Sequence, residues 1–150
     1  MATSTLNLSD LPNWLDGIDP SKIDLRAVLR TVGLYLASQA KRNFDQGQSP
    51  DGVPWAPLVR PSRKRGGPTA KPLRDTGILM ASMAAGADHV EDIDAASLTW
   101  GTNVWYAGFH QHGTRRIPAR PFIGLTPQME MRIAQIVIDG IAKQVKARAT

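Results

Sequence analysis

Two long runs of apolar residues, spaced at helical steps near opposite ends of the chain, constrain its fold more than any other feature. In the first run, apolar side chains recur every three or four positions: Leu25, Val28, Leu29, Val32, Leu36, Ala40 and Phe44. The second run has the same spacing: Met129, Ile133, Ile136, Val137, Ile141 and Val145. This period places each set on one face of an α-helix. The pattern predicts two long amphipathic helices that bury these faces in a core, although a subunit interface would leave the same pattern in the first.

Helix start signals precede both runs. Asp19 followed by Pro20 predicts that the first helix begins at residue 20, with the aspartate as its N-cap. Thr126 followed by Pro127 predicts the start of the second helix. Residues 8–22 are typical of a short helical turn that ends before the first long helix.

Between the two helices, the sequence predicts a small antiparallel β-meander or hairpin with extended arms and loops. Residues 45–61 contain an Asp51–Gly52 turn signal and several prolines, which favour an edge strand or an extended arm that packs Trp55 onto the first helix. Residues 73–90 fit neither the strand nor the helix period. Residues 97–110 are typical of a β-hairpin with its turn at 101–103 and its second strand at 104–109. These elements together predict an α+β fold.

Length and composition favour a single domain over residues 1–150. A chain of this length that is 42% hydrophobic supplies one core, and residues 1–21 are expected to form an N-terminal extension of it. The absence of cysteine excludes disulfides, thiol nucleophiles and cysteine-based zinc sites. No segment has the pattern of a secretory signal or a membrane span, so we expect no membrane partner.

A basic loop is expected at residues 60–74. The formal net charge of the chain is +5, and the loop has six basic residues and no acidic one: Arg60, Arg63, Lys64, Arg65, Lys71 and Arg74. One interpretation is contact with DNA phosphates or with an acidic protein surface; the other is a solvated loop kept soluble by its charges. The loop has no aromatic residue on which a nucleic-acid base would stack.

The residues that suggest a catalytic or metal site do not complete one. His110 and His112 would point the same way on a strand, but no third ligand is near, and His89 is the only other histidine. The carboxylates within residues 88–94 are better interpreted as an acidic hairpin turn. The chain also lacks the nucleophile turn G-x-S-x-G and the glycine motifs that bind phosphate. We therefore expect no enzyme activity, no metal and no cofactor.

Residues 106–124, with the sequence "YAGFHQHGTRRIPARPFIG", are interpreted as a structural exit from the predicted hairpin. Gly113 permits a turn, the prolines that follow it stiffen an extended run, and Phe122 anchors that run. Arg120 stands between rigid residues. We expect its guanidinium to make a bidentate contact with a carboxylate, within the fold or on a neighbouring subunit.

Five segments occur in a set order along the chain: "NF" at 43–44, "PDGVPWAPL" at 50–58, "LRDTGILMASM" at 73–83, "YAGFHQHG" at 106–113 and "IPARPFIGL" at 117–125. This ordered set resembles the phage virion morphogenesis family, the tail completion proteins of Mu-like and related tailed phages. The resemblance implies a structural virion assembly protein that completes the tail at the neck and enables head–tail joining. It also implies that the chain has no catalytic residue and no cofactor.

The resemblance implies partners and a location as well. It implies a homo-oligomer in the form of a six-fold ring, which contacts tail terminator or tail tube proteins, head–tail connector proteins and the packaged DNA. The protein would lie in the virion, after assembly in the host cytoplasm. From the residues alone, the alternative is a DNA-binding protein that uses the basic loop at 60–74. An enzyme that uses the histidine pair with a metal ranks third.

We expect the subunit or partner interface to draw on residues from these segments: Trp55, Thr76, Gly77, Tyr106, His110, Gln111, Gly113, Arg115, Arg116, Arg120 and Phe122. Within this set, Trp55, the Thr76–Gly77 step and residues 106–113 are expected to hold the fold and its junctions. The three arginines are expected to contact a neighbouring subunit or a tail protein. The basic loop is expected to face either the DNA path or an acidic connector surface.

Overall fold

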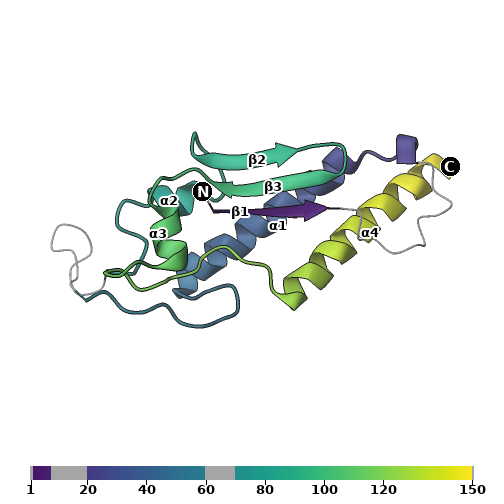
Figure 1. The fold of residues 1–150 in the computed structure, drawn as a ribbon. Helices are drawn as coiled ribbons and strands as arrows, with labels where there is room; N and C mark the ends of the chain where they lie inside the picture. Colours follow the sequence, from purple (N-terminus) through teal and green to yellow (C-terminus); the bar gives the residue numbers. More distant parts are fainter. Residues whose placement is uncertain (1, 8–19, 60–69, 150) are drawn as a thin grey trace.

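The chain has the predicted α+β fold, in which a three-stranded sheet and a long C-terminal helix pack against a long N-terminal helix. The computed structural model describes residues 2–7, 20–59 and 70–149. In chain order the elements are β1 (Ala2–Asn7), a 3-10 turn (Pro20–Lys22), α1 (Leu25–Gln46), α2 (Ile78–Ala81), β2 (His89–Ile93), β3 (Ser97–Thr102), α3 (Ala107–His112) and α4 (Pro127–Ala149). Figure 1 shows the sheet and α4 lying along α1, with α2 and α3 gathered near the end of α1.

Helix α1 begins at Leu25 rather than at residue 20, so the predicted start is wrong. The Asp24 carboxylate caps the helix by accepting a hydrogen bond from the Ala27 amide at 3.2 Å. The Gln144 side chain fixes this cap, because it accepts from the Asp24 amide at 2.7 Å and donates to the Asp24 carbonyl at 3.0 Å. The start of α1 therefore depends on a residue near the end of α4. The turn predicted within residues 8–22 lies mostly outside the described residues.

Helices α1 and α4 run antiparallel and bury their predicted apolar stripes. The buried members are Val28, Leu29, Val32, Leu36, Ala40 and Phe44 on α1, and Met129, Ile133, Val137 and Ile141 on α4. Helix α4 begins at Pro127 as predicted, and the Thr126 hydroxyl accepts a hydrogen bond from the Met129 amide at 3.2 Å. Val145, the last residue of the second stripe, is 40% exposed. None of the described helices is long and apolar enough to cross a membrane.

Strand β3 is confirmed, but the partner strand predicted for it is wrong. Leu98 and Trp100 are buried, and β3 pairs antiparallel with β1 and β2 on its two sides. Residues 104–109 were predicted as the second strand, but residues 107–109 belong to α3 instead. The Thr102 hydroxyl accepts from the Val104 amide at 3.1 Å and turns the chain out of the sheet. Tertiary context thus overrides the β propensity of this segment.

Two other predicted segments take a definite form in the structure. Residues 73–90, which fit neither period, contain α2 and the first residues of β2. The acidic segment at 88–94 is mainly strand β2 rather than a turn, and the hairpin turn that follows it is closed by the Asp94 amide donating to the Ser97 carbonyl at 3.0 Å. The extended arm predicted within residues 45–61 is confirmed over the residues that the structure describes, which end at 59. It contains a turn in which the Gly52 amide donates to the Ser49 carbonyl at 2.9 Å.

Close packing between α1 and α4 predicts opposite effects for two glycine-to-alanine substitutions. A Cβ at Gly140 would lie 2.8 Å from a Val28 methyl group, whereas a Cβ at Gly108 in α3 would meet no atom of the described residues within 4 Å. Both substitutions gain helix propensity, by up to about 1 kcal/mol. The clash should reverse this gain for Gly140→Ala and lower the free energy of unfolding by about 1 kcal/mol, while Gly108→Ala should raise it.

Urea denaturation of the two variants measures this difference. Val28→Ala in the Gly140→Ala background should recover part of the loss, because it vacates the space that the new methyl group enters. Equal effects of the two substitutions would contradict the close contact between the helices.

Candidate partner-binding site

Two extended arms meet beside α3. The side chains that join them are among those predicted from the sequence to lie at junctions or interfaces. The first arm is residues 47–59, which follow α1, and the second is residues 113–125, which lead into α4. The Trp55 indole donates to the Pro121 carbonyl at 2.7 Å. The Phe44 ring lies against both arms, with its centroid 5.5 Å from the Trp55 ring and 5.7 Å from the Phe122 ring. The arms are therefore anchored on the end of α1, and Trp55 packs there as predicted.

Gln111 of α3 binds the second arm through three hydrogen bonds. Its side-chain oxygen accepts from the amides of Phe122 at 3.1 Å and Ile123 at 3.2 Å, and its nitrogen donates to the Ile123 carbonyl at 2.6 Å. Gly113 ends α3 with a φ of 74°, and a Cβ there would lie 2.8 Å from the Ala119 amide. A residue with a side chain would force these backbones apart, so glycine is required at this turn.

Arg120 is buried and binds the first arm from the second. The residue is 5% exposed. Its Nε atom donates to the Ala56 carbonyl at 2.8 Å, and its Nη2 atom donates to the Pro57 carbonyl at 3.0 Å. The predicted bidentate contact exists, but with two carbonyls of the same chain instead of a carboxylate. The proline-rich arm forms no sheet ladder to satisfy these carbonyls, so a side chain does so. Arg120 therefore makes these contacts within the chain, and its role at a partner interface stays a prediction.

A pocket of about 410 Å³ lies between α2, α3 and the arms. Apolar side chains such as Leu73 and Leu79 line it together with Tyr106 and His110. The Nδ1 atom of His110 is buried and has no hydrogen-bond partner among the described residues. Burial lowers the pKa of His110, and the positive charge of Arg120 lowers it further.

The Thr76–Gly77 step forms the entry to α2 at the rim of this pocket. Gly77 has a φ of 76°, and the Thr76 hydroxyl accepts from the Ile78 amide at 3.3 Å. Both residues therefore shape a local turn, and Thr76 is also exposed. Thr76 is one of the residues that line the pocket.

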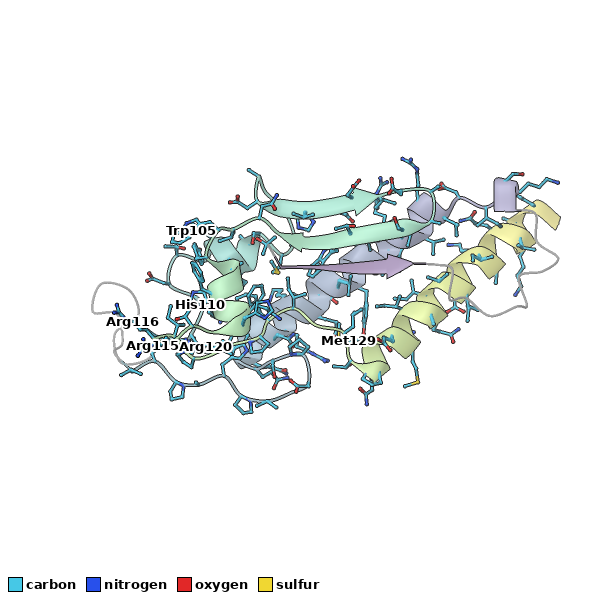
Figure 2. The ribbon with its side chains drawn as sticks, viewed as in Figure 1. Trp105, His110, Arg115, Arg116, Arg120 and Met129 are labelled. Atoms are coloured by element: carbon cyan, nitrogen blue, oxygen red, sulfur yellow. The ribbon has the colours of Figure 1, made fainter. Side chains whose placement is uncertain are left out.

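The outer side of α3 carries exposed aromatic and basic residues. Trp105 is 79% exposed and Phe109 is 48% exposed, and their rings meet edge to face at 6.1 Å. Arg115 and Arg116 are exposed in the turn that follows α3, and Figure 2 shows both at the same end of the molecule as Trp105. Sequence reasoning missed the two aromatic residues because it placed them on a strand. Their spacing of four residues is the helical signal that would have found them.

Only part of the predicted basic loop falls within the described residues. Lys71 donates to the Asp45 carbonyl at 3.2 Å, and Arg74 lies 3.5 Å from the Asp45 carboxylate. Asp45 also binds Lys41, and this hydrogen bond is the main cause of the lowered pKa of Asp45. Arg60, Arg63, Lys64 and Arg65 lie outside the described residues. In the described part of the chain, no group of three or more His, Cys, Asp or Glu side chains is placed to hold a metal.

Removing the Arg120 side chain should loosen the junction of the two arms. We expect Arg120→Ala to lower the free energy of unfolding by about 2 kcal/mol, because two carbonyls lose charged donors. Arg120→Lys should recover only part of this, since one ammonium does not reproduce the planar fork. Arg115→Ala, which changes an exposed arginine nearby, is the matched control and should be nearly neutral. Urea denaturation tests all three, and a neutral Arg120→Ala would contradict the proposed clamp.

His110 should make stability depend on pH. Its pKa is lowered in the folded chain, so the unfolded chain binds the proton more tightly. The stability that the neutral ring provides is then fully present above the ordinary pKa of about 6.5 and declines as pH falls below it. Thermal denaturation between about pH 7 and pH 5 should show this decline, and His110→Gln should reduce it. His112→Gln, at an exposed position on the same helix, should retain the wild-type slope.

Sequence comparison finds known relatives for most of this chain. The phage virion morphogenesis family matches residues 6–142. The chain is similar to Mu-like prophage FluMu G protein 1 of Haemophilus influenzae, with 36% identity over 106 residues that cover 69% of this chain and 70% of the relative. It is also similar to Mu-like prophage FluMu G protein 2 of the same organism, with 31% identity over 140 residues that cover 89% and 90%. No solved structure matches significantly. The chain therefore belongs to the phage virion morphogenesis family and has a structural role in phage morphogenesis.

Proposed function

We propose that this protein completes the tail of a tailed phage at the neck and allows the tail to join the head. It acts as a structural component of the virion rather than as an enzyme, after synthesis and assembly in the host cytoplasm. Membership of the phage virion morphogenesis family supports a morphogenesis role. The more specific position at the neck rests on the resemblance of the ordered segments to tail completion proteins.

The main support for the proposal is an exposed surface at α3 that the rest of the fold holds in a fixed position. Gln111 binds the second arm to this helix, and Arg120 binds the first arm to the second. Trp105, Arg115 and Arg116 therefore project from a fixed scaffold. Tryptophan and arginine are the residue types that contribute most often to protein interfaces. A surface of this kind suits contact with protein partners, namely copies of the same chain in a ring, tail terminator or tail tube proteins, and head–tail connector proteins.

DNA binding by the basic loop at 60–74 is the alternative. The net charge of +5 supports it, but Lys71 and Arg74 already bind Asp45. A DNA-binding protein would have an affinity for duplex DNA that falls steeply as salt increases. It would not need tails as partners.

Deletion of the gene from an inducible phage tests the proposal directly. We expect lysates that contain full heads and separate tails, and restoration of joined particles when the chain is supplied in trans. The purified, labelled chain should bind the head-proximal end of tails from the deletion strain, as seen by electron microscopy. Joined, infectious particles from the deletion strain would refute the role at the neck. Binding to DNA without binding to tails would favour the alternative.

A further inference from the structure

The exposed side of α3 forms a surface that no part of the described chain covers. We call it the basic–aromatic face, and it consists of Trp105, Phe109, Arg115 and Arg116. Edge-to-face ring contacts hold Trp105 against Tyr106 at 5.4 Å and against Phe109 at 6.1 Å, which orders a side chain that would otherwise be free. Neither arginine of this face has an ion pair within the described residues. Figure 2 shows Trp105, Arg115 and Arg116 at the same end of the molecule. Exposed tryptophan and arginine are residue types enriched at protein interfaces.

A surface of opposite charge lies on the β2–β3 hairpin. We call it the acidic face, and it consists of Asp92 and Asp94, both exposed. Glu91 points to the other side of the sheet, where it lies against Gly33 of α1. Strand β2 is an edge of the three-stranded sheet, so nothing among the described strands pairs with its outer side. None of these carboxylates has an ion pair within the described residues.

The two faces lie toward different ends of the molecule. The end of β2 at Ile93 pairs with Leu98 at the start of β3, whereas α3 follows the far end of β3. Figure 1 shows the turn between β2 and β3 on the side of the chain's C-terminus and α3 on the opposite side. Because of this separation, the faces do not neutralise each other within one copy.

We propose that the basic–aromatic face of one copy binds the acidic face of a second copy. This inference rests on the proposed function, to which it adds the subunit contact. Charge complementarity selects this occupant, because the chain itself carries an unpaired acidic surface at the other end of the fold. A contact between two different faces is heterologous, so repeating it adds copies in one direction and closes into a ring when the rotation per copy permits. The ordered rings of Trp105 and Phe109 form the desolvated centre of the contact, and the arginines form its charged rim.

Charge reversal with rescue tests the contact. The first variant is Arg115→Glu with Arg116→Glu, the second is Asp92→Lys with Asp94→Lys, and the third combines all four changes. Sedimentation of the purified chain over a range of concentrations measures self-association. Each reversal alone should weaken association by about tenfold or more, and the combined variant should restore it to near the wild-type strength. Arg132→Glu with Lys143→Glu changes two exposed charges on α4 and should have little effect.

A second pair of variants tests the aromatic centre. Trp105→Ala should weaken association by about tenfold, whereas Leu34→Ala, which truncates a side chain on α1 that is 69% exposed, should not. Circular dichroism and urea denaturation should show that all variants remain folded. Three results would overturn the proposal. The wild-type chain could stay monomeric at its highest soluble concentration, or the combined variant could fail to restore association. The third is self-association that is as strong in the first and second charge-reversal variants as in the wild-type chain.

The same variants separate this inference from the proposed function. If the combined reversal does not restore association but the wild-type chain still joins heads to tails in the deletion strain, the subunit contact is wrong and the neck role stands. If deletion leaves joining intact while charge reversal and rescue behave as expected, the contact stands and the neck role is wrong. Loss of DNA binding as the only effect of Arg115→Glu with Arg116→Glu would assign the basic–aromatic face to DNA and reject the copy contact.

Discussion

The need to satisfy the backbone of two proline-rich arms is the constraint on which the rest of this structure depends. Proline removes amide donors and prevents a regular ladder, so the arms cannot become strands of the sheet. Side chains replace the missing ladder: Arg120 donates to two carbonyls of the first arm, Gln111 binds the second, and Trp55 joins them. The position of α3, the pocket beside it and the exposure of Trp105 all follow from this junction.

The antiparallel pair of long helices provides the platform that carries the junction. Gly140 allows α4 to approach Val28 closely, and Gln144 fixes the cap at the other end of α1. Phe44, near the end of α1, then contacts a ring from each arm. Helix α1 therefore connects the core to the junction of the two arms. The position of the exposed surface on α3 is fixed by packing against this core.

Membership of the phage virion morphogenesis family indicates a structural role, and the structure narrows the residues available for contact with partners. Within the expected interface set, Trp55 and Gln111 were expected to hold the fold and its junctions, and Arg120 to contact a neighbouring subunit or a tail protein. The structure places the polar groups of all three, and the Phe122 ring, in contacts within the chain. Arg115 and Arg116 remain exposed, and Trp105 and Phe109 join them. The first group of residues thus holds the arms and α3 in place. The second group is exposed and available to contact a partner.

The sequence by itself determined the two long helices, the α+β class, strand β3 and the arm anchored by Trp55, because helical and strand periodicity and proline placement are local signals. It also marked the stretch around Gly113 and Arg120 as structural. Only the tertiary structure decided that residues 107–112 form a helix, that β3 pairs with β1 and β2, and that Arg120 binds carbonyls rather than a carboxylate. Each of these depends on partners far away in the sequence, as the start of α1 depends on Gln144. Local periodicity contains no information about which distant group will satisfy a backbone donor or acceptor.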